Sequence, residues 1–329
     1  MDLRQFRYFV AVAEERHFGR AAQRLSMTQP PLSQQIRALE ASLGAPLFVR
    51  TNRSVELTAV GRQLLPEVRR ILADADALPA LAQGLAHGEV GTLSLGFVST
   101  ADYGILPPLL REFGERYPRV RLQLLEATSD VQVEALMDGR IDAGLFIPPV
   151  PARYANELSY LPIVREPLML ALPAGRHGAA EDADDADDAD SVDDEPASRS
   201  DGQPGAPVSL ADFADEPLVI FPRRVAPAFY DIIMGCYAAL GLTPRVGQEA
   251  IQMQTIVSLV SAGMGVALVP QSLCHLRRTG VTYRALRETS ALIETGLLWR
   301  TAEVTPVLEG FLETARGVAH TPPGATLST

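Results

Sequence analysis

The sequence predicts an α/β protein composed of a small helical module, a long helix and a large domain of alternating strands and helices. Apolar residues recur at helical spacing through the first 45 residues, and a second apolar stripe in steps of four and three runs from residue 64 to 85. From residue 91 onward, short alternating segments follow one another with helical segments between them. A chain of 329 residues has room for two or three such domains.

The composition is that of a globular chain whose negative charge is concentrated in one segment. Apolar residues make up 47% and charged residues 21%, no apolar run reaches membrane-spanning length, and the N-terminus lacks a secretory core. We therefore expect a cytoplasmic protein without membrane contact. Residues 181–201 carry −10 of the net charge of −11, whereas residues 1–65 contain nine Arg against five acidic residues. The basic N-terminal end is where nucleic acid would bind.

Three helices are expected before residue 45. The first runs from about residue 2 to 15, and the second lies around residues 21–25, where small alanines allow another helix to approach closely. The third follows the cap residue Thr28, tolerates Pro30 and Pro31 in its first turn and ends at Gly44. Its buried stripe consists of Leu32, Ile36, Leu39 and Leu43.

The other face of the third helix is polar and is followed by a hairpin. Gln34 is suited to a bidentate contact with adenine, and Arg37 to guanine or phosphate. Gln29 and Ser33, with the free amides of the first turn, suit phosphate oxygens. Strands at 47–50 and 55–57 place Arg53 at a turn that would lie over the DNA backbone or in a minor groove. A plain helical bundle with solvated arginines is the alternative, but the order of these elements favours DNA binding.

Residues 1–65 resemble the winged helix-turn-helix of LysR-type transcriptional regulators. The motifs shared with that family are AAxxL at 21–25, QPPLSxQI at 29–36, LE at 39–40, LG at 43–44, PLFxR at 46–50 and LTxxG at 57–61. The start of the chain and its PPLS segment further resemble the branch that includes regulators of aromatic-compound catabolism. Many relatives have arginine at the position of Gln34, which changes the base preference implied there. The expected DNA-binding residues are Gln29, Pro30, Pro31, Ser33, Gln34, Arg37, Arg50 and Arg53.

A linker helix is expected from the cap residue Thr58 onward. Its apolar stripe has heptad-like spacing, which suits pairing with a second helix, and Pro79 is expected to kink or end it. The alternative is that the stripe packs on its own domain. The family resemblance implies an antiparallel linker-helix dimer. The residues of the stripe are Leu64, Val68, Ile71, Ala75, Leu78, Ala82 and Leu85.

The remainder predicts a βαβ arrangement with a mostly parallel sheet. It resembles the two-lobed, periplasmic-binding-protein-like effector domain of the same family. Ligands of such folds lie at strand carboxyl ends and helix N-termini. Arg223 is expected to meet a carboxylate, whereas Ile147 stands where some relatives have an inducer-binding arginine. Ser99 and Ser129 fit helix capping equally well. The expected effector-binding residues are Ser99, Thr100, Thr128, Ser129, Ile147, Arg223, Pro227, Phe229 and Ile251.

The domain boundaries follow from these patterns. Residues 1–58 are assigned to the DNA-binding domain, 59–90 to the linker helix, 91–316 to the effector domain and 317–329 to a tail. Lobe I is expected at about 91–163 and 270–316, and lobe II at about 164–269. The acidic repeats predict that 178–207 is a disordered, solvated insert without a calcium-loop pattern.

The function predicted is that of a transcription regulator that binds promoter DNA and responds to an aromatic or other small organic acid. The resemblance implies a dimer of dimers and contact with RNA polymerase. One alternative is a redox-sensing regulator that uses Cys236 and Cys274, and another is a small-molecule receptor without DNA binding. No enzyme motif, metal-ligand spacing or cofactor motif is present in the sequence, so neither catalysis nor a cofactor is expected.

Overall fold

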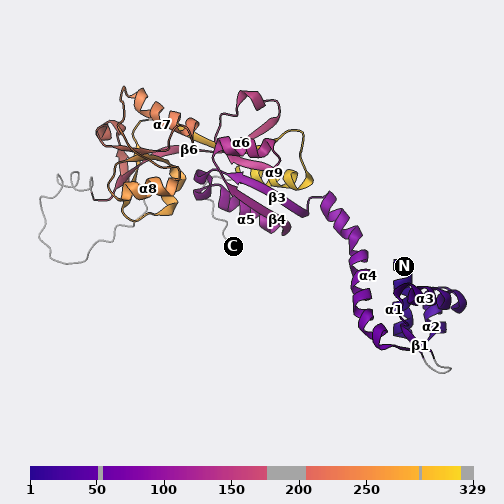
Figure 1. Ribbon diagram of the computed structural model, residues 1–329. Helices are drawn as coiled ribbons and strands as arrows, with labels where there is room; N and C mark the ends of the chain where they lie inside the picture. Colours follow the sequence, from indigo (N-terminus) through magenta and orange to yellow (C-terminus); the bar gives the residue numbers. More distant parts are fainter. Residues whose placement is uncertain (51–54, 176–204, 289–290, 320–329) are drawn as a thin grey trace, which may run out of the picture. The chain divides into compact units, whose positions relative to one another are not determined.

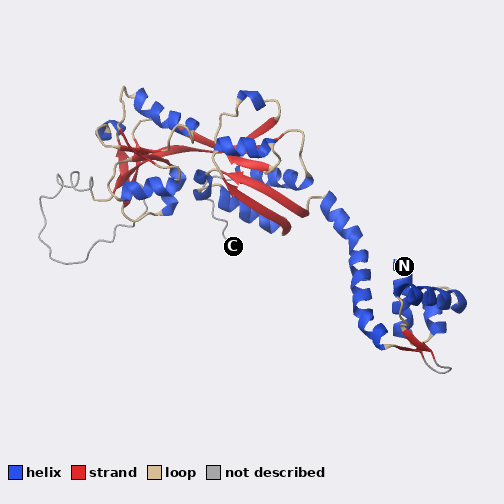
Figure 2. Ribbon diagram, in the orientation of Figure 1, coloured by secondary structure: helices blue, strands red, loops and turns tan. Residues whose placement is uncertain are grey.

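The computed structural model describes residues 1–50, 55–175, 205–288 and 291–319, which belong to an N-terminal unit (Met1–Gly84) and a C-terminal unit (Leu85–Thr329). The N-terminal unit has the expected order of helices and a hairpin (Figures 1 and 2). Its elements are α1 (Leu3–Glu15), α2 (Phe18–Arg24), α3 (Gln29–Leu43), β1 (Phe48–Arg50), β2 (Val55–Leu57) and α4 (Ala59–Ala86). The hairpin is antiparallel and pairs Arg50 with Val55. Arg53 lies outside the described residues.

Capping and burial explain why these helices form where they do. Asp2 begins α1 with a capping box shared with Gln5, and the His17 side chain accepts hydrogen bonds from two backbone amides at the start of α2. Gly44 ends α3 in the left-handed conformation, at φ 68°. One core joins the three helices, the hairpin and the first turns of α4. Its largest buried members are Phe9, Leu32, Ile36, Leu39 and Leu47.

Helix α4 continues past the position where the sequence predicted a break. It contains both Pro66 and Pro79 and extends to Ala86, so Pro79 does not end the helix, whereas the kink that was the other expected effect stays a prediction. The predicted stripe also divides along its length. Val68 and its neighbour Leu72 are buried in the core of the N-terminal unit. Ile71, Leu78 and Leu85, by contrast, are 41%, 59% and 49% exposed.

Lobe I of the C-terminal unit has a parallel sheet with helices on both faces. Strand β3 pairs in parallel with β4 and β5. Helices α5 and α9 share one core with this sheet, and α6 contributes to a separate core that includes Phe146 and Leu158. The bounds are β3 (Val90–Phe97), η1 (Ser99–Tyr103), α5 (Leu106–Arg116), β4 (Arg119–Glu126), α6 (Ser129–Met137), β5 (Ala143–Phe146), η2 (Ala152–Tyr154) and α9 (Pro306–Ala319).

Two long strands, β6 (Leu158–Pro173) and β12 (Leu292–Arg300), join the lobes. They pair antiparallel from Leu158↔Arg300 to Leu292↔Pro167, and the second half of β6 then pairs with β10 and β11. Figure 1 shows β6 passing from one lobe to the other. The lobe II elements are β7 (Gly205–Val208), η3 (Leu210–Phe213), β8 (Leu218–Ile220), α7 (Pro227–Ala239), β9 (Val246–Glu249), α8 (Met253–Ser261), β10 (Ala267–Pro270), η4 (Gln271–Leu276) and β11 (Val281–Leu286).

The strand pairing corrects four expectations. The main sheet, ordered β4-β3-β5-β12-β6-β11-β7 with β10 also on β6, is mixed rather than mostly parallel. Residues 271–286 belong to lobe II rather than lobe I, because Leu273 and Tyr283 are buried in its core. Residues 205–207 form part of β7, which pairs with β11, and so are not part of a disordered insert. Helix α9 extends to Ala319, three residues into the predicted tail.

Candidate functional site

Helix α3 carries the candidate nucleic-acid interface on the face opposite its buried stripe. Leu32, Ile36 and Leu39 are fully buried, which fixes the rotation of the helix on its unit. The candidates are therefore turned toward solvent. Gln29, Pro30, Pro31, Gln34 and Arg37 are exposed, and Ser33 is half-buried.

The first turn of α3 offers fewer donors to phosphate than the sequence analysis expected. Helix N-termini bind anions through free backbone amides. Pro30 and Pro31 occupy the second and third helical positions and have no N–H group. The amides of Gln29 and Leu32 are the ones that remain in this turn. Phosphate contact at this end of the helix therefore depends more on side chains than on the backbone.

The arginines of the N-terminal unit fall into two groups. Glu14 accepts hydrogen bonds from Arg69 and Arg24, both at 2.7 Å, and these contacts lower the pKa of the Glu14 carboxyl group. Arg7 pairs with Asp76 at 2.7 Å. Arg37 makes no ion pair with any residue of the described ranges. Its guanidinium is therefore available to an external anion.

The hairpin is anchored by residues whose roles the sequence analysis did not identify. The Glu40 carboxylate accepts hydrogen bonds from the backbone amides of Leu47 and Phe48, at 2.8 and 3.1 Å, where the chain enters β1. Thr58 caps α4 by accepting a bond from the Gly61 amide at 2.9 Å. A Cβ on Gly61 would lie 2.3 Å from the Leu47 carbonyl oxygen. The LE and LTxxG motifs thus hold the hairpin between α3 and α4.

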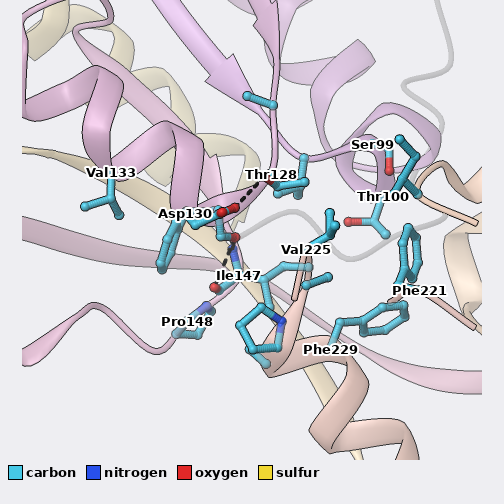
Figure 3. A pocket seen from close by; sticks show the side chains of 18 of the residues that line it. Ser99, Thr100, Thr128, Asp130, Val133, Ile147, Pro148, Phe221, Val225 and Phe229 are labelled. Carbon is cyan, nitrogen blue, oxygen red and sulfur yellow. Dashed lines mark hydrogen bonds between the residues drawn. The ribbon is translucent and has the colours of Figure 1, made fainter. Parts of the chain in front are cut away.

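A second candidate site is a cavity of about 680 Å³ between the two lobes of the C-terminal unit (Figure 3). It lies at the carboxyl ends of β3, β4 and β5 and at the N-termini of α6 and α7, the usual place for a ligand in such sheets. Eight of the nine predicted residues line it. They are Ser99, Thr100, Thr128, Ser129, Ile147, Pro227, Phe229 and Ile251.

Arg223 is the predicted residue that the structure places elsewhere. It does not line the cavity, and its guanidinium makes two hydrogen bonds to Asp231, at 2.8 and 3.1 Å. The Asp231 carboxylate, which does line the cavity, is thereby paired, and its pKa is lowered by these bonds. The Arg223 guanidinium is therefore paired with Asp231 on α7, and its expected contact with a ligand carboxylate stays a prediction.

Hydrogen bonds within lobe I shape the cavity floor. The Ser129 hydroxyl bonds to both the amide and the carbonyl of Ile147, at 3.2 and 3.3 Å, and so ties the start of α6 to the end of β5. Behind it, the fully buried Gln132 donates to the carbonyls of Ala127 and Leu145. Ser129 is thus the first residue of α6, and its hydroxyl bonds to Ile147 rather than capping the helix; its contact with a ligand stays a prediction.

Thr100 is a buried polar residue at the cavity. It is 6% exposed, and its hydroxyl has no hydrogen-bond partner among the described residues. Figure 3 shows this side chain directed into the cavity, near Phe221 and Phe229. Those two rings pack edge to face with centroids 5.4 Å apart. Phe221 and Val225 were not among the predicted residues, since neither is polar nor lies at a helix start.

The comparisons with known proteins identify the domains that carry the two candidate sites. A model described as bacterial regulatory helix-turn-helix protein, lysR family, matches residues 3–62, and a LysR substrate binding domain model matches residues 86–319. The chain belongs to the LysR family of transcriptional regulators. It is therefore a DNA-binding regulator with an effector-binding domain, and not an enzyme.

Individual relatives match over almost the whole length of the regulator. It is 52% identical over 312 residues to the HTH-type transcriptional regulator IlvR of Caulobacter vibrioides, covering 95% of this chain and 96% of that protein. It is 34% identical to the probable cat1 operon transcriptional activator of Acinetobacter lwoffii, covering 89% of each. The structure of full-length CbnR complexed with its target DNA matches with a TM-score of 0.74 and 31% identity, covering 97% of this chain and 100% of that one.

The remaining candidate chemistry finds little support in the structure. Cys236 and Cys274 are half-buried free thiols, and burial raises the pKa of each, which disfavours the reactive thiolate. Within the described ranges, no group of His, Cys, Asp and Glu is arranged to hold a metal ion. The helices of those ranges include none with the length and apolar character needed to cross a membrane.

Proposed function

We propose that this regulator reads a specific promoter sequence through α3 and its hairpin, and that a small organic inducer bound in the lobe I–lobe II cavity changes how it binds DNA. The observation that carries the proposal is the large, mainly apolar cavity between the lobes, at the strand ends and helix starts where ligands of such sheets bind. Beside it, the buried Thr100 hydroxyl has no hydrogen-bond partner among the described residues.

DNA recognition is assigned to the exposed face of α3. Gln34 has the donor and acceptor pair that reads adenine in the major groove, and Arg37, which makes no ion pair with a described residue, suits guanine or phosphate. Arg50 and Arg53 of the hairpin are proposed to contact the backbone or an adjacent minor groove. Promoter DNA of a bacterium lies in the cytoplasm, which is where we place this activity.

The oligomer is proposed to form through α4. Ile71, Leu78 and Leu85 follow one another at intervals of seven, and all are exposed in the single chain. An exposed apolar seam with this repeat is stabilised when a second helix covers it. We propose that paired helices hold two DNA-binding units apart, and that two such pairs form a dimer of dimers.

Inducer action is proposed to be a shift between two arrangements of the lobes. β6 and β12 both pass between the lobes and can bend without losing their pairing within each lobe. An inducer that contacts both lobes shifts the equilibrium toward the arrangement that it binds more tightly. The size of the shift is set by the difference between its affinities for the two arrangements. The new arrangement would change the spacing of the DNA-binding units and their contact with RNA polymerase.

The inducer itself is proposed to be small and largely apolar. Phe146, Phe221 and Phe229 line the cavity and favour an aromatic or aliphatic skeleton. The organic acid expected from the sequence depended on Arg223, which Asp231 occupies. The charge of the inducer is therefore decided by the other lining residues.

Selection of binding sites from a random DNA library tests the DNA-reading part of this proposal. The wild-type regulator should enrich a defined sequence, and Gln34→Ala should relax the preference at one base position per half-site. Gln35→Ala is the matched control, because this neighbouring side chain accepts a hydrogen bond from Gln5 of α1 at 3.0 Å. No enriched sequence with the wild type, or equal effects of the two variants, would contradict the assignment.

A further inference from the structure

The charges around the cavity have one sign. Three charged side chains are found among the described residues that line it, Glu126, Asp130 and Asp231, and all are acidic. Asp231 is paired with Arg223. Neither Glu126 nor Asp130 makes an ion pair with a described residue, so two of the acidic residues that line the cavity have no cationic partner within the described ranges.

The N-termini of α6 and α7 do not reverse this sign. Asp130 lies in the first turn of α6 and accepts a hydrogen bond from the Thr128 hydroxyl, so the positive end of this helix already faces a carboxylate. Helix α7 begins with Pro227, which supplies no N–H group. At the start of α6 the Asp130 carboxylate thus partly offsets the positive end of the helix. At the start of α7 one fewer N–H group is available to an incoming carboxylate.

A neighbouring hollow is lined by one arginine and one acidic residue, whose charges cancel. Arg224 and Glu249 both line this adjoining hollow, which shares Ile251 and Gln252 with the main cavity. The surroundings of Ile251 therefore add no net positive charge. The polar side chains that line the main cavity include those of Ser99, Thr100 and Gln252, all of them neutral. A hydroxyl or amide of this kind can donate to or accept from a neutral group.

We infer that the inducer is a small, mainly apolar molecule without net negative charge, a neutral or amine-bearing compound. This inference rests on the proposed function, since it names the ligand class of the same cavity. A carboxylate would be placed close to Glu126 and Asp130 with no cation to offset the repulsion. An alcohol, carbonyl or amide avoids this repulsion, and an ammonium group gains from it.

A head-group series on one skeleton tests the inference. Binding of 2-naphthoate, 2-naphthamide, 2-naphthalenemethanol and 2-naphthylmethylamine to the full-length regulator is measured by calorimetry. We expect the three non-anionic compounds to bind at least about tenfold more tightly than 2-naphthoate, a ratio typical of one unfavourable charge in a partly solvated site. Equal or tighter binding of 2-naphthoate would overturn the inference, as would failure of all four to bind.

Charge variants show whether the carboxylates cause the preference. The double substitution Glu126→Gln and Asp130→Asn should raise the affinity for 2-naphthoate and lower that for the amine, with the alcohol unchanged. Glu134→Gln is the matched control, because Glu134 is an exposed acid on the same helix and does not line the cavity. A preference that survives the double substitution would overturn the inference.

The DNA readout separates this inference from the proposed function. Non-anionic compounds that bind tightly but leave a promoter footprint unchanged would contradict the inducer role while supporting the inferred ligand class. If 2-naphthoate binds best and alters the footprint, the inducer role stands and the inferred ligand class is wrong.

Discussion

Replacing Thr100 with valine should stabilise the ligand-free regulator and weaken the binding of its ligand. The hydroxyl of this residue is buried and has no hydrogen-bond partner among the described residues. Valine has nearly the same shape and no polar atom, so the substitution removes a desolvated group without leaving a cavity. An unsatisfied buried polar group costs about 1–3 kcal/mol. We therefore expect the free energy of unfolding to increase by about 1 kcal/mol or more, which corresponds to roughly 2–4 °C in Tm.

Unfolding of the C-terminal unit, which contains Thr100, can be followed in the full-length chain. The sequence contains one tryptophan, Trp299, and it lies in β12 of the C-terminal unit. Urea unfolding followed by tryptophan fluorescence therefore reports on this unit without truncation. The denaturant midpoint is compared at equal protein concentration, because oligomerisation also changes apparent stability.

Thr314→Val is the matched control for Thr100→Val. Thr314 is equally buried, at 1% exposure, but its hydroxyl donates to the Gly310 carbonyl at 2.9 Å. Removing this satisfied hydroxyl should destabilise the unit by about 0.5–1.5 kcal/mol. The two variants should thus change stability in opposite directions. A loss of stability in Thr100→Val as large as that in Thr314→Val would refute the view that the Thr100 hydroxyl is unsatisfied without ligand.

Three further predictions concern other parts of the chain. Arg37→Ala should weaken DNA binding and, if its contact is phosphate, reduce the slope of log affinity against log salt by about 1, measured by fluorescence anisotropy. Gly61→Ala should destabilise the N-terminal unit by about 1–3 kcal/mol in calorimetry, because its Cβ would lie 2.3 Å from the Leu47 oxygen; an unchanged transition would contradict this. Burial raises the pKa of Glu166 despite hydrogen bonds from Ser272, so its stabilising contribution, present at acid pH, is lost as pH rises through the folded-state pKa. Glu166→Gln should accordingly raise the Tm more at pH 8 than at pH 4, and an equal gain at both would contradict the raised pKa.

Local patterns predicted the N-terminal unit well, because its elements are short and follow one another in space. The stripe of α3 and its glycine stop are encoded within a few residues, and the structure confirms both. The cap at His17 was missed, since histidine is not a usual N-cap residue. The role of Glu40 was also missed, because its partners Leu47 and Phe48 lie beyond the end of the helix.

The linker helix shows why periodicity alone is ambiguous. Within the same apolar repeat, Val68 is buried in the core of its own unit, whereas Leu78 and Leu85 are exposed to solvent. A single sequence contains no signal for where one role ends and the other begins. Proline was also given too much weight, because α4 continues past Pro79.

The candidate cavity was predicted from topology more reliably than from charge. Positions at strand ends and helix starts, together with the family resemblance for Ile147, Pro227 and Phe229, led to eight of its lining residues. The position of Arg223 depended on a partner eight residues later, Asp231, and no rule of spacing indicates which anion such an arginine binds. The lobe boundary was misplaced because β11 pairs with the second half of β6 in lobe II before the chain returns to lobe I through β12.

Genome-wide footprinting with the purified full-length regulator, without ligand and with 2-naphthalenemethanol or 2-naphthoate, tests the central claim most directly. We predict protection of an inverted repeat at a promoter, and a change in the length of that protection with the neutral compound but not with the acid. A regulator that protects no defined site, or a footprint that neither compound alters even though one of them binds the cavity, would contradict the account.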